Sequence, residues 1–411
     1  MEKNNLAKIE RINKWVFYGL VGLLGFLPFS SWIVSLTGKS SISLLRDLFV
    51  GLIFLMALYG VYLKKKKIDK SLWLFVVFIL FGLLSVFWRE DSLMQWLRGF
   101  RFIFMPIVLF LSVSLMDLTE KQKSWIYKVL IVGGSVISAL AILELVGVRI
   151  PLTTSLSSTG ALVSEHISGS LKIPRLQGVL AGPNALGLYM MALVGCCLGI
   201  FQKFGKTSKW LLGIFFVVLV LTFCRSALIG AILMLFSVLF VYLKDRFNLR
   251  IAVTSLCLGL FLLAGLGLVV YSNASTKDLL THYASSQDRI KQYERIWDTR
   301  NEIGLVGRGM GTAGPASQYS LDGTTNRWTE NIYLDTFEQL GLIGMGLLVA
   351  MFGYFLAASY KKYGMLEYKS AFLLTLAMAI SGLFINIYTG QVGIFLMFLI
   401  SGLMISKNNM K

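Results

Sequence analysis

Long apolar stretches recur along the whole chain and constrain its fold more than any other feature. Several reach the roughly 18 to 20 residues that a helix needs to cross a hydrocarbon core about 30 Å thick. Of the 411 residues, 56% are hydrophobic and only 15% are charged, a balance that no soluble domain of this size needs. The sequence therefore predicts an all-α polytopic membrane protein with a single transmembrane domain over residues 1–411.

The apolar stretches predict about twelve transmembrane helices. Their approximate ranges are 15–37, 43–63, 72–88, 99–117, 125–147, 178–202, 209–223, 226–243, 251–271, 334–359, 370–388 and 391–405. The first follows a basic head and is too long for a signal-peptide core, so we expect it to be retained. The run from Trp210 to Leu243 is too long for one crossing and is divided at Cys224-Arg225-Ser226, because a charge at mid-membrane is costly. Arg225 is then expected at a tight outer turn.

Positive charge indicates the orientation of these spans. All inner loops are basic in this numbering, as the positive-inside rule requires, so both termini are expected in the cytoplasm. The residues concerned are Lys64 to Lys67, Lys121, Lys123, Lys203, Lys206, Lys209, Lys244, Arg246, Arg250, Lys361 and Lys362. Because the net charge of +18 is divided between two sides of a membrane, it does not indicate a nucleic-acid partner.

Two connections are long, and both are expected on the outer side. They cover residues 148–177 and 272–333, the second just before the tenth span. The second holds a polar, helical piece from Ser285 to Asp298 and then Gly-rich turns from Gly304 to Gly314. Loops of this length usually carry function, so these outer loops are the predicted working surface.

Arginine and lysine are distributed differently between the two sides. The predicted topology places 3 Arg and 20 Lys inside against 12 Arg and 4 Lys outside. Arginine binds phosphate or carboxylate oxygens with two parallel hydrogen bonds and keeps its charge, so the outer set predicts an anionic ligand, most naturally a phosphate or pyrophosphate. Arg175 and Arg225 are the strongest candidates, since each lies beside a helix mouth with few acidic neighbours.

The alternative is that the outer arginines pair with acids or contact lipid headgroups. The nearby acids are Glu90, Asp91, Asp288, Glu294 and Asp298. For any single arginine this alternative is favoured, whereas for the whole set the anion site is favoured.

Other motifs point to structure more than to chemistry. Gly307-Arg308-Gly309-Met310-Gly311-Thr312 resembles a dinucleotide-binding motif in its glycine spacing. No strand precedes it and no helix of a βαβ unit follows it, so a turn is the better interpretation. His166 and His282 lie far apart, and the four cysteines lack paired spacing, so no metal site is predicted. Gly182-Pro183-Asn184, inside an apolar span, indicates either a kink or a ligand cavity.

Glu330 begins the segment that enters the tenth span, Glu330-Asn331-Ile332-Tyr333-Leu334. A carboxylate at the membrane surface near cations could remove a proton from a sugar hydroxyl. The alternative is a plain helix start, with Thr329 as its cap and Glu330 favouring the positive helix end. The residues alone do not decide between the two.

Over residues 170–350 the chain resembles the O-antigen polymerase and ligase superfamily of bacterial membrane glycosyltransferases. The resemblance rests on the order and spacing of several short motifs. These are Gly182-Pro183-Asn184-Ala185-Leu186-Gly187, Cys224-Arg225-Ser226-Ala227, Gly307-Arg308-Gly309-Met310-Gly311, Glu330-Asn331-Ile332-Tyr333-Leu334 and Glu338-Gln339-Leu340-Gly341-Leu342-Ile343-Gly344.

The resemblance implies a GT-C-like glycosyltransferase fold acting at the outer face of the cytoplasmic membrane, without metal or other cofactor, on glycans carried by undecaprenyl pyrophosphate. A polysaccharide chain-length regulator is a candidate partner besides the lipid-linked glycan and the bilayer. In the ligase branch a histidine typically precedes Asn-x-Tyr-Leu. Glu330 stands at that place here, which favours a polymerase of O-antigen, capsule or exopolysaccharide over a ligase.

The predicted site follows from this resemblance together with the arginine distribution. The expected pyrophosphate ligands are Arg175, Arg225, Arg289, Arg308 and Arg327. Glu330 is expected to accept the proton of the attacking hydroxyl and Asn331 to orient that hydroxyl, while Arg225 stabilises the leaving group. The competing hypotheses are an O-antigen ligase-type transferase and a lipid-linked sugar transporter or flippase, although carriers concentrate ionisable residues near the membrane midplane.

Overall fold

The structure is a computed structural model that describes residues 2–38, 41–65, 68–145, 155–156, 162–163, 175–246, 283–319 and 327–406. These residues are almost entirely helical, apart from a two-residue antiparallel pair of strands, β1 (Ser155–Leu156) and β2 (Leu162–Val163). Within these described ranges, seven helices are long and apolar enough to cross a membrane, and three shorter apolar helices accompany them. The prediction of a polytopic helical membrane protein is confirmed, and the protein is a multi-pass membrane protein. The predicted span 251–271 lies outside the described residues.

The N-terminal half consists of long helices that follow the predicted spans. They are α1 (Glu2–Phe26), η1 (Leu27–Phe29), α2 (Ser30–Thr37), α3 (Ser41–Lys64), η2 (Lys70–Leu72), α4 (Trp73–Leu84), η3 (Ser85–Phe87), α5 (Leu93–Leu115) and α6 (Glu120–Leu145). The predicted range 15–37 is divided in the structure, since a 3-10 turn with Pro28 near its start separates α1 from α2. Proline cannot supply the N–H that would continue the helix.

The C-terminal half contains α7 (Pro183–Leu221), α8 (Arg225–Arg246), α11 (Tyr283–Asp298), α12 (Arg300–Ile303), η4 (Gly314–Tyr319), α13 (Ile332–Tyr360), α14 (Leu366–Ser381) and α15 (Gln391–Ile405). The predicted range 370–388 was wrong at its end, because α14 stops at Ser381 and turns lead to α15. The polar piece expected from Ser285 to Asp298 is helical, as α11 shows.

The element α7 reverses direction within its length. A straight helix of its 39 residues would extend about 58 Å. Yet a Cβ at Gly187, near its beginning, would lie 2.5 Å from Cys224, just beyond its end. Leu193 and Phe215 both contact Gly134. The stretches 183–199 and 208–221 are therefore antiparallel arms, in agreement with the two spans predicted at 178–202 and 209–223.

The proposed break at Gly182-Pro183-Asn184 was wrong. Gly182 is the N-cap of α7 and Pro183 occupies its first turn, so this motif begins a helix instead of interrupting one. Proline is favoured at that position because the first N–H groups of a helix have no intrahelical acceptor.

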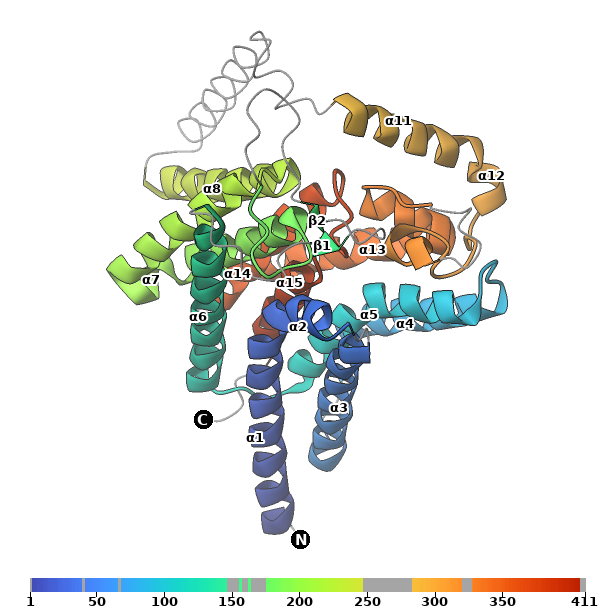
Figure 1. Cartoon of the computed structure of the whole chain (residues 1–411). Coiled ribbons are helices and arrows are strands. Elements are labelled where there is room, and N and C mark those ends of the chain that lie inside the picture. The colour runs from blue at the N-terminus through green and yellow to red at the C-terminus, as the bar shows by residue number, and fades with distance from the viewer. Residues whose placement is uncertain are drawn as a thin grey trace.

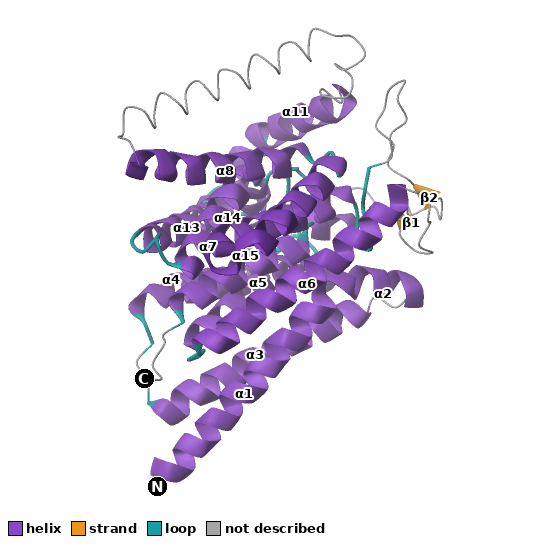
Figure 2. Cartoon of the chain, turned by 90° about the vertical axis from the view of Figure 1, so that its left-hand side faces the viewer, coloured by secondary structure: helices purple, strands orange, loops and turns teal. Residues whose placement is uncertain are grey.

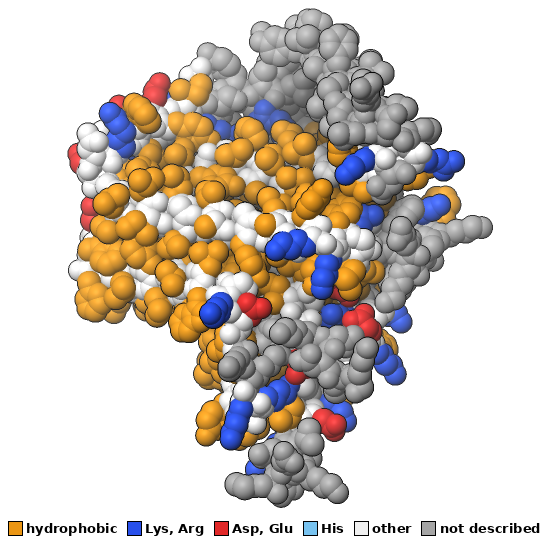
Figure 3. Space-filling model, turned by 180° about the vertical axis from the view of Figure 1, so that it is seen from behind, with side chains coloured by type: hydrophobic (Ala, Val, Ile, Leu, Met, Phe, Trp, Pro, Cys, Tyr) orange, Lys and Arg blue, Asp and Glu red, His pale blue; other side chains and the backbone are white. Residues whose placement is uncertain are grey.

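The helices share one apolar core centred on α15, which packs against α5, α7 and α14 (Figures 1 and 2). Exposed hydrophobic side chains such as Trp15, Leu48, Leu55 and Tyr62 point away from it. Hydrophobic side chains cover most of the face in Figure 3, as expected of a surface in contact with lipid. The beginning of α1 and the helices α11 and α12 lie at opposite ends of the molecule (Figures 1 and 2).

Candidate functional site

The tight turn between α7 and α8 places two of the predicted arginines together. Only Thr222, Phe223 and Cys224 separate the helices, so the division predicted at Cys224-Arg225 is confirmed. Arg175 donates from Nε to the carbonyl oxygen of Thr222 at 2.9 Å and from Nη2 to Oδ1 of Asn184 at 2.8 Å. Arg175 thereby joins the start of α7 to the turn that presents Arg225.

Arg289 of α11 completes a cluster of three arginines, Arg175, Arg225 and Arg289. Burial and, secondly, the positive charge of Arg225 lower the pKa of Arg289, so the two guanidinium groups lie within electrostatic range. Arg225 also lies within electrostatic range of the positive charge of Arg175. Residues from three separate segments therefore concentrate positive charge at one place, which is a favourable environment for a multiply charged anion.

Glu330 lies against this arginine cluster. Its carboxylate forms an ion pair with Arg289, and both side chains are partly exposed, at 32% for Glu330 and 26% for Arg289. The structure thus brings the predicted base beside the predicted anion ligands, although they are separated by 41 residues or more in sequence. Nε of Arg289 is buried and has no hydrogen-bond partner among the described residues.

Asn331 caps the helix that follows Glu330. Its Oδ1 accepts from the N–H groups of Tyr333 and Leu334, at 2.9 and 3.1 Å, and its Nδ2 donates to the carbonyl oxygen of Leu383 at 3.1 Å. The suggestion of Thr329 as the cap was wrong. Three backbone groups bind the asparagine amide, and these bonds fix where α13 begins and hence where Glu330 lies.

Asp335 forms a buried polar network that the sequence analysis missed. Oδ1 of Asp335 accepts from the hydroxyl of Thr329 at 2.7 Å and from its N–H at 3.0 Å, and Oδ2 accepts from Asn386. These bonds fasten the segment before α13 to the turn after α14. The sequence did contain a sign of this network, because Asp335 is an acidic residue one turn into an apolar helix. Acidic residues are rare in membrane spans and need partners there.

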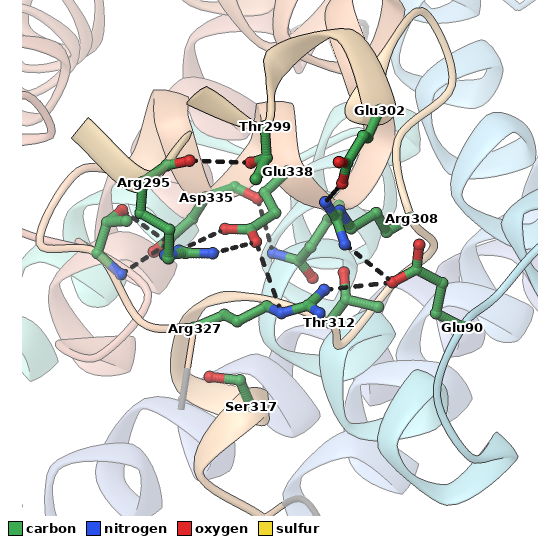
Figure 4. Close-up of polar contacts among 12 residues, drawn as sticks. Glu90, Arg295, Thr299, Glu302, Arg308, Thr312, Ser317, Arg327, Asp335 and Glu338 are labelled. Carbon is green, nitrogen blue, oxygen red and sulfur yellow. Dashed lines mark hydrogen bonds and ion pairs between the residues drawn. The ribbon is translucent and has the colours of Figure 1, made fainter. Parts of the chain in front are cut away.

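A second charged group, the Arg–Glu cluster, joins α11, α12 and α13 to the Gly-rich segment and to the turn between η3 and α5 (Figure 4). It consists of Arg295, Arg308, Arg327, Glu90, Glu302 and Glu338. Arg308 contacts Glu302 at 2.8 Å and Glu90 at 3.4 Å. Arg327 contacts Glu90 at 3.2 Å and Glu338 at 3.9 Å.

Pairing with acids is thus what the structure shows for Arg308 and Arg327. The three arginines and three glutamates of this cluster balance in charge, whereas the ion pair of the arginine cluster joins Arg289 to Glu330. Of the five predicted pyrophosphate ligands, the structure brings three together next to Glu330 and places two in the Arg–Glu cluster.

The Gly-rich segment docks onto a break in α13. Backbone N–H groups of Arg308 and Gly309 donate to the carbonyl oxygens of Glu338 and Gln339, at 3.0 and 2.9 Å. The break is at Gly341, where φ is +64° and a Cβ would lie 2.2 Å from the carbonyl oxygen of Leu305. The interpretation of this glycine motif as a turn is confirmed, and its function is to fit closely against another backbone.

A third charged group was also missed by the sequence analysis. Arg46 and Asp47, in the first turns of α3, form an ion pair at 2.8 Å, and Asp47 also pairs with Arg101 of α5. Arg46 further contacts Gln391 at the start of α15. These charges pair with one another and join α3, α5 and the start of α15, a common arrangement for ionisable groups within a helix bundle.

Among the residues that the structure describes, no group of three or more potential ligands could hold a metal ion. His166 and His282 fall outside those residues. Cys196, Cys197 and Cys224 are buried free thiols, consistent with a packing role, and Cys257 lies outside the described ranges.

The fold and the site together define a multi-pass membrane protein with an arginine cluster beside a carboxylate at one end of its helix bundle. Residues 210–349 match the family model described as O-Antigen ligase. This part of the chain, which includes the turn between α7 and α8 and the start of α13, is therefore similar to the O-antigen ligase family. The matched region includes Arg225, Arg289 and Glu330, while Arg175 precedes it. No curated protein matches the chain.

Proposed function

We propose that this protein polymerises undecaprenyl pyrophosphate-linked oligosaccharide repeat units into a surface polysaccharide at the outer face of the cytoplasmic membrane. The observation that carries the proposal is the convergence of Arg175, Arg225 and Arg289 beside the carboxylate of Glu330. The arginines suit a diphosphate, and the carboxylate suits a sugar hydroxyl. The departure from histidine at position 330 favours a polymerase over a ligase.

The reaction is a glycosyl transfer with a diphosphate leaving group. The acceptor hydroxyl oxygen forms a bond to the anomeric carbon of the donor, and the bond from that carbon to the diphosphate oxygen breaks with its electron pair. Arg175, Arg225 and Arg289 stabilise the negative charge that develops on the leaving oxygen. Glu330 accepts the hydroxyl proton and later releases it to water. The arginines supply charge stabilisation that many transferases draw from a metal ion, so we propose a metal-independent enzyme.

The remaining predicted site residues act as positioning residues in this proposal. Asn331 caps α13 and sets the place of Glu330. Arg308 and Arg327 hold the Gly-rich segment and the start of α13 through Glu90, Glu302 and Glu338. We therefore assign the leaving group to the three arginines that lie together, and not to all five.

The proposed orientation has both termini in the cytoplasm and the arginine cluster on the outer side. It is supported by the basic inner loops and by the position of α11 and α12 at the opposite end of the molecule from the beginning of α1 (Figure 1). We further propose that the chain forms one membrane domain of about twelve spans, with 148–177 and 272–333 as its outer loops.

The test is polymerisation by the purified protein in detergent, supplied with an undecaprenyl pyrophosphate-linked repeat unit. The expected product is a ladder of longer glycans on the lipid. Arg225→Lys should abolish the ladder, because lysine cannot form two parallel hydrogen bonds with phosphate. Arg300→Lys is the matched control, since Arg300 is exposed and stacks on Trp297.

Two other outcomes of this assay would indicate a function other than polymerisation. Transfer of the glycan to a different lipid acceptor without a ladder would indicate a ligase. Absence of any transfer, together with movement of the lipid-linked unit across proteoliposomes, would make the protein a carrier and overturn the catalytic proposal.

A further inference from the structure

Arg289 has two competing tasks in the site. As a member of the arginine cluster it is a proposed ligand of the diphosphate, yet in this structure its guanidinium group is paired with Glu330. The same carboxylate is the proposed base. One ion pair therefore occupies an anion ligand and a proton acceptor at once.

The surroundings of Arg289 favour a second anion. Arg289 pairs with the carboxylate of Glu330 and also lies within range of the positive charge of Arg225, which is itself within range of Arg175. Its Nε is buried and has no hydrogen-bond partner among the described residues. A buried donor without an acceptor costs about 1 to 3 kcal/mol, so a phosphate oxygen at this position would remove a penalty.

We propose that Glu330 and the polyprenyl diphosphate compete for Arg289, so that binding of the leaving group frees the carboxylate to act as base. This inference rests on the proposed function. A diphosphate carries more charge than a carboxylate and can also engage Arg175 and Arg225, so it is the stronger competitor for the shared guanidinium group.

The competition links donor binding to base strength. While Glu330 is paired with Arg289, the cation stabilises the ionised carboxylate and makes it a weak proton acceptor. When the diphosphate takes Arg289, the carboxylate loses its cation and lies near additional negative charge. Both changes increase its affinity for a proton. The base is then active when a donor is bound, and the ion pair re-forms after the lipid diphosphate leaves and the proton passes to water.

Binding of farnesyl diphosphate to the full-length protein in detergent tests the competition without requiring catalysis. Glu330→Gln removes the competing carboxylate while preserving side-chain size, and it should tighten binding roughly three- to fivefold, the upper part of the range that a partly exposed ion pair supplies. Glu294→Gln is the matched control. It removes one negative charge from the exposed side of α11, the helix that carries Arg289, and should leave affinity within about twofold. Arg289→Gln should weaken binding, and all variants should keep the thermal unfolding temperature of the parent.

The outcomes separate this inference from the proposed function. Binding that depends on Arg289 but is unchanged or weakened in Glu330→Gln would overturn the competition and leave the diphosphate site in place. Equal tightening in Glu294→Gln and Glu330→Gln would show a general charge effect and would also overturn the competition. Absence of binding in the parent and in Glu330→Gln would overturn the diphosphate site and the competition together.

Discussion

Glu338, fully buried in α13, accepts two hydrogen bonds from Arg295 of α11, at 2.6 and 2.8 Å. This bidentate pair fixes α11 against α13. Because Arg289 belongs to α11 and Glu330 lies just before the N-cap of α13, the pair also sets how Arg289 meets Glu330. The Arg295–Glu338 pair therefore helps to set the geometry of the Arg289–Glu330 pair.

Arg295→Met should destabilise the protein by about 3 kcal/mol, because removing one partner leaves a buried charge without compensation. Arg327, at 3.9 Å, is too distant to replace the bidentate contact. Denaturant unfolding in detergent measures the loss. Arg300→Met is the control and should have little effect, since Arg300 is exposed. Equal stability of the two variants would contradict a structural role of the Arg295–Glu338 pair.

Gly341→Ala should prevent correct docking of the Gly-rich segment. Position 341 has φ of +64°, and a Cβ there would lie 2.2 Å from the carbonyl oxygen of Leu305, so both the backbone conformation and the contact exclude a side chain. A Cβ at Gly346, in the same helix, would meet nothing within 4 Å, and Gly346→Ala should be neutral or stabilising by up to about 1 kcal/mol. The yield and thermal unfolding of the two variants provide the comparison.

Asn331→Ala should lower the free energy of unfolding by about 1 kcal/mol through loss of the helix cap. Asn331→Asp keeps the acceptor for Tyr333 and Leu334 and loses the donor to Leu383, so most of the stability should return. Thermal unfolding of both variants separates the cap from the donor. If Asn331→Asp is as unstable as Asn331→Ala, the bond to Leu383 is the more important contact.

Arg289→Lys should make polymerisation sensitive to alkaline pH. Burial and the neighbouring charge of Arg225 lower the pKa of a cation at this position, and an ordinary lysine has a pKa of about 10.4. The lysine is charged below its lowered pKa and becomes neutral as pH rises through it, whereas arginine keeps its charge. Ladder formation by the variant should fall relative to the parent as pH rises toward the ordinary pKa of lysine, about 10.4. Parallel pH profiles would contradict a requirement for charge at position 289.

Much of the fold follows from local sequence. Apolar stretches predicted the helices, the polar stretch before Asp298 predicted α11, and the cost of a charge at mid-membrane predicted the turn at Cys224-Arg225. Gly182-Pro183-Asn184 was misread because the same residues that interrupt a helix also begin one. The choice depends on whether residues before them are helical, and here Arg175 and its neighbours form an irregular segment.

The sequence by itself determined the class of protein, its helical composition, the arginines of the loops and helix ends, and the position of Glu330 beside a helix start. These properties depend on side-chain transfer energies and short-range patterns, which are readable along the chain. Only the tertiary structure decided that Arg175, Arg225 and Arg289 lie together, that Arg308 and Arg327 pair with glutamates, and that Asp335 and Asn386 support the site. Such pairings join residues far apart in the chain, and they exist because packing of helices brings the partners into contact.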